Sequence, residues 1–205
     1  MGIRNKLGIL GGSFNPIHTG HLILAQQALE SYELDQVLFV PCALPPHKDP
    51  GMLLPGGVRL AMVQMALAGD PRFEASAIEL ERGGTSYAVD TLRQLTEMYP
   101  ESDLYFIIGD DTLVELYQWH RIYDLLPLCT FVTFGRNREA IRPDALHLDP
   151  PWPARLLATA TMARRFEVAS SDIRHRVAEG MSIRYLVPDV IDMYIAEHHL
   201  YLGEC

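Results

Sequence analysis

The sequence of 205 residues contains only three cysteines, Cys42, Cys129 and Cys205, which are odd in number and widely spaced. A disulfide framework or a CxxC metal site is therefore not expected, and a reducing compartment is favoured. No apolar run reaches the roughly 18 residues that a membrane helix needs, and no Lys- or Arg-led apolar leader opens the chain. We expect a soluble, cytoplasmic protein without a membrane partner.

Basic residues are also scarce, because 17 Lys and Arg stand against 26 Asp and Glu, for a formal net charge of −9. Broad nucleic-acid binding needs a basic face, so no nucleic-acid partner is expected. An anionic small ligand is still allowed, since backbone N–H groups at the start of a helix can hold it with a few well-placed cations. A hydrophobic content of 48% suits one compact domain.

Short apolar runs alternate with helical patterns along the chain. The runs predict buried strands at residues 7–10, 37–40, 104–108 and 128–134, with a looser extended segment at 73–80. Helices are predicted near 20–32, 58–67, 86–98, 111–117, 170–179 and 188–198, with Ser86 and either Ser170 or Ser171 as caps. Residues 135–165 are read as loops with a short helix. The alternation predicts an α/β fold, a Rossmann-like, doubly wound, mostly parallel sheet with helices on both faces and a small C-terminal helical part.

The first strand ends in Gly-Gly-Ser-Phe-Asn-Pro-Ile-His-Thr-Gly-His, residues 11–21. The segment precedes a helix, where N–H groups and the positive end of the helix dipole attract an anion. His18 and His21 are three residues apart, so both can face one phosphate, and Gly20 removes a steric block between them. The segment is neither a Walker A loop nor a GxGxxG fingerprint, and a metal would lack a third nearby ligand. Two capping histidines on a tight turn are the plainer alternative.

This segment resembles the signature of the HxGH nucleotidylyltransferases. The resemblance implies an ATP site that includes Gly12, Ser13, Phe14, His18 and His21. Residues 168–174, Val-Ala-Ser-Ser-Asp-Ile-Arg, are similar to the second motif of that family, Ile-Ser-Ser-Thr-x-Ile-Arg, with Ala169 in place of its first Ser. Hydroxyls at a helix start and an arginine one turn later suit phosphate oxygens, which adds Ser170, Ser171 and Arg174 to the ATP site. Without the first motif, an ordinary capped helix with a surface arginine would be preferred.

Within this superfamily, nearly the whole chain resembles the bacterial nicotinate mononucleotide adenylyltransferases. The likeness rests on residues 45–48, 84–87, 91–92, 107–111, 119, 185–188 and 200–201, whereas residues 136–165 match poorly. It implies one nucleotidylyltransferase domain over residues 1–205, with a helical part from about 169, and a transfer of AMP from ATP to nicotinate mononucleotide that gives deamido-NAD and pyrophosphate. His18, His21 and Arg174 would be catalytic.

The resemblance also implies roles for residues that lie after the other strands. Lys48 and His47 would neutralise the mononucleotide phosphate, although a solvated loop lysine is the alternative. Backbone N–H groups near Thr85 and Tyr87 would hold the carboxylate, and Trp119 would offer a flat face to the pyridinium ring or else simply pack. For ATP, Asp111, or its neighbour Asp110, would accept from ribose hydroxyls, and Arg136 would cover the adenine.

Because a phosphate nucleophile is already ionised, the expected in-line displacement needs positioning and charge stabilisation rather than a strong base. Mg²⁺ is expected to arrive with ATP, held mostly by water and phosphate oxygens, with no metal ligands from the protein. The acceptor could instead be nicotinamide mononucleotide, pantetheine phosphate or glycerol phosphate. A nucleotide-binding sensor without turnover and a purely structural α/β domain are alternatives of another class. The oligomeric state stays open, a homo-oligomer included.

Overall fold

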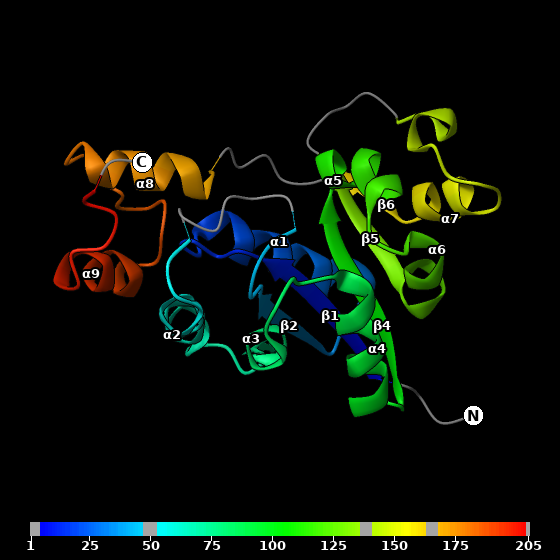
Figure 1. Cartoon of the computed structure of the whole chain (residues 1–205), viewed down its shortest axis with the longest axis horizontal. Helices are drawn as coiled ribbons and strands as arrows, with labels where there is room; N and C mark the ends of the chain where they lie inside the picture. The colour runs from blue at the N-terminus through cyan, green and yellow to red at the C-terminus, as the bar shows by residue number, and fades with distance from the viewer. Residues whose placement is uncertain (1–4, 47–52, 136–140, 163–167, 204–205) are drawn as a thin grey trace. The chain divides into compact units, whose positions relative to one another are not determined.

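The computed structural model describes residues 5–46, 53–135, 141–162 and 168–203 (Figure 1). Its strands are hydrogen-bonded in the order β3-β2-β1-β4-β5-β6, and the pairs β1–β4, β4–β5 and β5–β6 are parallel. The strands are β1 (Asn5–Gly12), β2 (Gln36–Pro41), β3 (Phe73–Ala75), β4 (Ser102–Gly109), β5 (Thr130–Gly135) and β6 (Ala160–Met162). This order is that of a Rossmann fold, so the predicted α/β fold is confirmed.

The α-helices of the described chain are α1 (Thr19–Tyr32), α2 (Gly56–Leu67), α3 (Ile78–Arg82), α4 (Ala88–Met98), α5 (Asp110–Glu115), α6 (Ile122–Leu125), α7 (Trp152–Ala158), α8 (Ser170–Ala178) and α9 (Asp189–Glu197). Single turns of 3-10 helix follow or precede them at Leu116–Gln118, Leu126–Leu128 and Pro143–Leu146. Each predicted long helix is therefore present, within a few residues of its predicted ends.

The chain divides into two compact units, and the first comprises Met1–Leu10, Leu24–Leu38 and Tyr87–Arg165. In this unit β1 and β4 run in register, with Leu7 opposite Leu104, and β4 continues into β5 with Ile107 opposite Val132. All four of these side chains are buried, as expected for strands of a parallel sheet that is covered on both faces. The short apolar runs of the sequence therefore form the centre of this unit.

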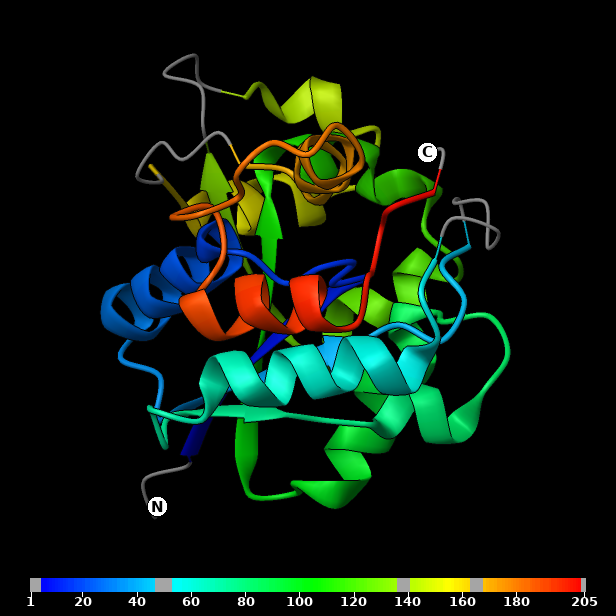
Figure 2. The same ribbon diagram turned by 90° about the vertical axis from the view of Figure 1, so that its left-hand side faces the viewer.

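The second unit comprises Gly11–Ile23, Phe39–Ser86 and Phe166–Cys205. It contains α2, α3, α8 and α9, and α9 lies along α2 (Figure 2). Met62 and Val63 of α2 and Ile191 and Ile195 of α9 are buried. The unit thus combines segments from the start, the middle and the end of the sequence. Its helices α2 and α9, from the middle and the end, share a buried core.

Some local predictions were wrong. Only Phe73–Ala75 of the segment expected to be extended is a strand, because α3 begins at Ile78. The region 135–165 holds, besides helix, a strand that was not predicted, β6. On α9, Val190 belongs to the apolar pattern that predicts this helix, but it is 42% exposed.

The predicted serine caps were wrong as well. Tyr87 and Ala169 occupy the N-cap positions of α4 and α8. The hydroxyls of the neighbouring serines have other partners, since Ser86 Oγ accepts from the Ala43 N–H at 2.8 Å and Ser170 Oγ donates to the Pro16 carbonyl at 2.9 Å. Tertiary hydrogen bonds therefore replace the local capping bonds that the sequence pattern suggests.

Candidate active site

The turn between β1 and α1 is tightly built around Phe14. This residue is fully buried and has φ of 44°, in the left-handed region where a bulky side chain is strained by about 1–3 kcal/mol. Its ring packs against Phe39 and, edge-on, against His21, with centroids 5.8 and 4.9 Å away. A Cβ on Gly12 would lie 3.2 Å from the Phe14 ring, so the glycine makes room for it. The aromatic packing holds the turn in its strained conformation.

The two histidines of the turn form one stacked pair. Their ring centroids are 3.6 Å apart at an interplanar angle of 24°, and the backbone N–H of His18 donates to Nδ1 of His21 at 3.2 Å. Because Nδ1 accepts this bond, the neutral His21 ring carries its proton on Nε2. His18 is buried, whereas His21 is half-buried. The N–H donor of the His21 ring is therefore at Nε2, and such a donor suits a phosphate oxygen.

Gly20 is required by the close approach of His18. A Cβ at Gly20 would lie 3.0 Å from Nδ1 and 3.1 Å from Cε1 of the His18 ring, closer than side chains ordinarily allow. The glycine that the sequence places between the histidines thus has a steric reason, as was predicted.

The second predicted motif lies against this turn. Arg174 Nη1 of α8 donates to the carbonyl of Asn15 at 2.9 Å, and Ser170 Oγ donates to that of Pro16 at 2.9 Å. This Arg174 bond uses one of the five N–H donors of the guanidinium. Ser171, one residue further along the first turn of α8, is exposed. The structure therefore brings Ser170 and Arg174 together with residues just before His18.

The other end of the turn is also held by the C-terminal part of the chain. The carbonyl of Leu186 accepts the backbone N–H of Thr19 at 2.9 Å and its Oγ1 hydroxyl at 2.8 Å. Leu186 belongs to the segment Tyr185–Pro188, which the sequence resemblance singled out without a chemical reason. These bonds supply the reason, because they fix the start of α1, where His21 lies.

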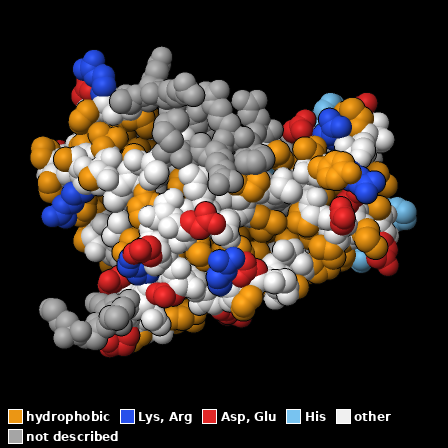
Figure 3. Space-filling model, turned by 180° about the vertical axis from the view of Figure 1, so that it is seen from behind, with side chains coloured by type: hydrophobic (Ala, Val, Ile, Leu, Met, Phe, Trp, Pro, Cys, Tyr) orange, Lys and Arg blue, Asp and Glu red, His pale blue; other side chains and the backbone are white. Residues whose placement is uncertain are grey.

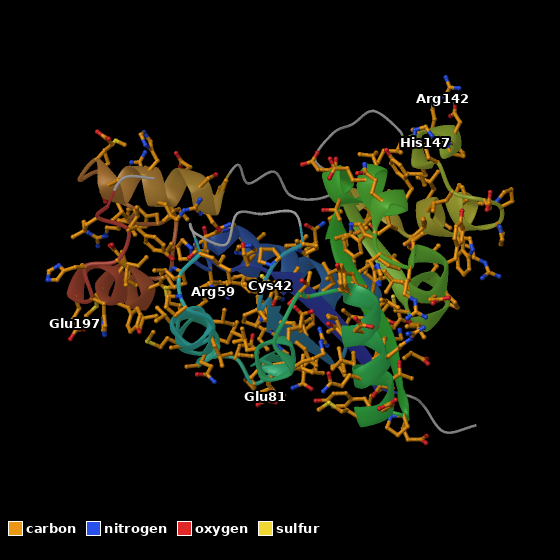
Figure 4. All side chains as sticks on the ribbon, in the orientation of Figure 1. Cys42, Arg59, Glu81, Arg142, His147 and Glu197 are labelled. Atoms are coloured by element: carbon orange, nitrogen blue, oxygen red, sulfur yellow. The ribbon has the colours of Figure 1, made fainter. Side chains whose placement is uncertain are left out.

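A buried arginine that was not predicted from the sequence, Arg59, donates a hydrogen bond to the same turn. Arg59 of α2 is 1% exposed. Its guanidinium donates to the carbonyls of Leu54 at 2.8 Å, Ser13 at 2.7 Å and Cys42 at 2.7 Å. Arg59 and Cys42 are labelled in Figure 4. Burial lowers the pKa of Arg59 from its ordinary value, against a smaller opposite influence from Cys42. An arginine inside the apolar pattern of a predicted helix is the sequence signal that could have revealed it.

Three of the predicted ligand-binding residues lie in the described part of the first unit. Asp111 at the start of α5 is exposed, while Asp110 is buried and accepts the Asp111 backbone N–H at 3.1 Å. Of the two carboxylates, Asp111 is thus the more accessible. Trp119 is half-buried with its ring edge-on to Phe106, at a centroid distance of 5.9 Å.

Tyr87, the third of these residues, packs against a histidine that the sequence analysis overlooked. Its ring lies 4.2 Å from that of the exposed His120, at an angle of 31°. His120 follows Trp119 directly, and this adjacency is the signal that could have found it. His120 therefore adds a third ring, which is next to Trp119 in the sequence and against Tyr87 in space.

Thr85 is exposed and lies near the end of the Phe39–Ser86 segment of the second unit, paired with Leu44 in an isolated parallel bridge. The backbone N–H of Ser86 donates to the Leu44 carbonyl at 2.8 Å, so this N–H is engaged within the protein. His47, Lys48 and Arg136 lie outside the described residues. Within the described ranges, no group of three or more His, Cys, Asp or Glu side chains could hold a metal ion.

Figure 3 shows basic and acidic side chains interspersed over the face that it displays. None of the helices formed by the described residues is long and apolar enough to cross a membrane.

Comparisons with known proteins identify the family. Residues 9–176 match the model of the cytidylyltransferase-like family. The chain is 43% identical to a probable nicotinate-nucleotide adenylyltransferase of Geobacillus thermodenitrificans, over 96% of this chain and 86% of the relative. It is 41% identical to another of Trichlorobacter lovleyi, over 96% and 99%. A solved nicotinic acid mononucleotide adenylyltransferase of Plasmodium falciparum has the same fold, with a TM-score of 0.77, 18% identity and 98% of each chain covered.

The motif-bearing turn, the second motif bonded to it, and relatives that match almost the full length all agree. The chain therefore belongs to the cytidylyltransferase-like family and, within it, to the nicotinate-nucleotide adenylyltransferases.

Proposed function

We propose that the chain transfers AMP from ATP to nicotinate mononucleotide, giving deamido-NAD and pyrophosphate in NAD biosynthesis. The observation that carries the proposal is the His18–His21 pair, in which the His18 N–H fixes Nδ1 of His21 at 3.2 Å beside a helix start. The full-length relatives, named as nicotinate-nucleotide adenylyltransferases, support the choice of reaction.

In the proposed reaction a phosphate oxygen of the mononucleotide attacks the α-phosphorus of ATP. The bond from the α-phosphorus to the bridging oxygen breaks, and pyrophosphate leaves from the opposite side. His21 Nε2–H donates to an α-phosphate oxygen, where negative charge grows in the transition state. His18 contacts the phosphates and fixes the tautomer of His21 through its backbone. No general base is needed, because the attacking phosphate is already ionised at neutral pH.

The leaving pyrophosphate is assigned to the second motif. Arg174 and Ser171 hold the β- and γ-phosphates, and Ser170 ties the start of α8 to the Pro16 carbonyl. Gly12, Ser13 and Phe14 line the ATP site; contact with the nucleotide involves the backbone at Phe14, since its side chain is fully buried. Asp111 accepts from the ribose hydroxyls of ATP, and Arg136 covers the adenine.

The mononucleotide is assigned to Lys48, His47, Thr85, Tyr87 and Trp119. Lys48 and His47 neutralise its phosphate, and Trp119 faces the electron-poor pyridinium ring in a cation–π contact. Backbone N–H groups near Thr85 and Tyr87 receive the carboxylate. The exposure of Thr85 and the half-buried aromatic rings are compatible with these assignments.

We further propose that Mg²⁺ enters with ATP as part of the substrate, coordinated by phosphate oxygens and water. The whole chain, residues 1–205, acts as one nucleotidylyltransferase domain in this proposal. A cytoplasmic location stays a prediction, and the oligomeric state, a homo-oligomer included, is open to a sedimentation measurement.

A direct assay tests the reaction and its acceptor. The protein is given MgATP with nicotinate mononucleotide, nicotinamide mononucleotide or pantetheine phosphate, and pyrophosphate release is followed. We expect the highest kcat/KM with nicotinate mononucleotide, because backbone donors favour a carboxylate over a carboxamide. Turnover only with the amide would reverse the choice of acceptor, and ATP binding without pyrophosphate from any acceptor would indicate a nucleotide sensor.

A further inference from the structure

Tyr201, which follows the last helix, bonds to the turn that carries the histidines. It lies in the left-handed region with φ of 63°, and its hydroxyl donates to Oδ1 of Asn15 at 3.0 Å. Asn15 is 3% exposed and lies three residues before His18. Tyr201 belongs to the pair Leu200–Tyr201, which resembles the family ending but has no part in the reaction described above. The bond therefore links the end of the chain to its first turn.

Asn15 is the point where several segments of the second unit meet. Its Oδ1 also accepts the backbone N–H of Leu54 at 3.3 Å, and its carbonyl accepts Arg174 Nη1 at 2.9 Å. Asn15 thus receives bonds from the segment before α2, from α8 and from the tail. Because its side chain is buried, each donor that reaches it restricts the position of the turn.

The environment of Tyr201 keeps its hydroxyl a donor. Burial raises the pKa of Tyr201, more than the nearby Arg174 and Arg59 guanidinium groups lower it. The phenol is therefore protonated at neutral pH and donates to the amide oxygen, which can only accept. Unlike the donors from Leu54 and Arg174, the Tyr201 hydroxyl can be removed by the deletion of a single oxygen atom.

We propose that Tyr201 is a positioning residue: through Asn15 it holds the turn in the geometry in which the His18 N–H fixes His21. The proposal rests on the adenylyl transfer proposed above. Loss of the hydroxyl leaves the ring in place but removes one tether of the turn, so the His21 donor is oriented less well. Since this donor acts on the transition state, the loss appears in kcat rather than in KM for the mononucleotide.

The test compares Tyr201→Phe with Tyr194→Phe, a matched variant on α9 whose ring stacks on His198 at 4.0 Å. We expect Tyr201→Phe to lower kcat about 3- to 10-fold, the loss that one neutral hydrogen bond supports. KM for the mononucleotide should stay near wild type, the urea midpoint should fall only slightly through the lost hydrogen bond, and Tyr194→Phe should match wild type throughout. Wild-type kcat in Tyr201→Phe, or an equal loss in Tyr194→Phe, would overturn the proposal.

Two further variants show whether the effect runs through Asn15. Asn15→Ala should lower kcat at least as much as Tyr201→Phe, and adding Tyr201→Phe to it should cause no further loss. Asn15→Asp keeps an acceptor oxygen and should retain more activity than Asn15→Ala. Independent, multiplicative losses in the double variant would contradict the proposed coupling, as would a Tyr201→Phe chain that never reaches the native circular dichroism spectrum.

Hydrogen exchange separates this inference from the proposed reaction. The backbone N–H of His18 is held by His21 and that of Thr19 by Leu186, at 3.2 and 2.9 Å. Tyr201→Phe should speed exchange at His18 and leave the backbone N–H of Thr91 in α4 unchanged. If wild type makes no pyrophosphate, the reaction fails and this exchange result still tests the tether. If wild type is active and exchange at His18 is unchanged, the tether alone fails.

Discussion

Single side chains and single atoms determine what the first turn can do. The bond from the His18 N–H to His21 Nδ1 decides which nitrogen of His21 carries the proton. The stacked arrangement needs Gly20, and the position of the turn needs bonds to Asn15 and Ser13 carbonyl oxygens from Arg174 and Arg59. The residues that touch the substrate in our proposal are therefore oriented in part by residues that do not, such as Gly20 and Arg59.

Gly20→Ala should lower kcat about tenfold, because the new Cβ would lie 3.0 Å from His18 Nδ1 and displace the ring by a few tenths of an ångström. Stability should change little, since the gain of up to about 1 kcal/mol that alanine has over glycine in a helix offsets strain at the buried His18 ring. The measurement is kcat together with the urea midpoint. Gly57→Ala in α2 is the matched control, because a Cβ there would meet no described atom within 4 Å. Equal kcat values in both variants would contradict the steric role.

Arg59→Ala should destabilise the protein by about 3 kcal/mol or more, since buried carbonyls of Leu54, Ser13 and Cys42 would lose their donor. The free energy of unfolding in urea measures this. The control is Arg142→Ala (Figure 4). The side chains of the Arg142–Asp144 ion pair are 80% and 68% exposed, so its loss should lower the free energy of unfolding by about 0.5 kcal/mol or less. Similar losses in the two variants would argue against the buried role of Arg59.

At the residue scale, the sequence predicted the side chains that belong to a contiguous motif. His18, Gly20 and His21 stand within four residues, and Ser170 and Arg174 share one helical turn. Arg59 and Tyr201 were not predicted as supports, because their partners are backbone or amide oxygens far away in sequence. Such partners follow from the folded arrangement and leave no local pattern.

At the scale of helices and strands, apolar periodicity was a good guide where an element is long and buried. The four main strands and six long helices appear near their predicted ends. The short strands were predicted poorly, because β3 and β6 have three residues each and show too little periodicity to be recognised. The predicted helix caps were wrong because the Ser86 and Ser170 hydroxyls bond to other segments of the chain, whereas the capping rule considers only neighbouring residues.

The packing of α9 on α2 gives a prediction at this scale. Ile191→Ala should cost about 2–5 kcal/mol of unfolding free energy, because Ile191 is fully buried. Met193→Ala on the same helix should cost about 0.5 kcal/mol or less, since Met193 is 70% exposed. Urea unfolding of both variants measures the difference. Costs that do not differ would mean that α9 does not bury Ile191 in solution.

For the whole molecule, the alternation of strands and helices over most of the sequence predicts a mostly parallel sheet, and the structure adds the strand order β3-β2-β1-β4-β5-β6. The relatives match over 96% of the chain, so the family resemblance is not confined to the motifs. Residues 135–165 resisted interpretation because their elements are short and rich in proline and arginine. A net charge of −9 is consistent with an enzyme that binds anions through a few oriented donors rather than through a basic surface.

The most direct test of the proposed chemistry is the turnover of His21→Ala with MgATP and nicotinate mononucleotide, measured as pyrophosphate release. His175→Ala, which removes an exposed imidazole from α8, is the control and should behave as wild type. We predict that His21→Ala lowers kcat by on the order of 100-fold or more, as the loss of one oriented transition-state donor does, while KM for ATP changes little. A His21→Ala protein with turnover close to wild type would contradict the account.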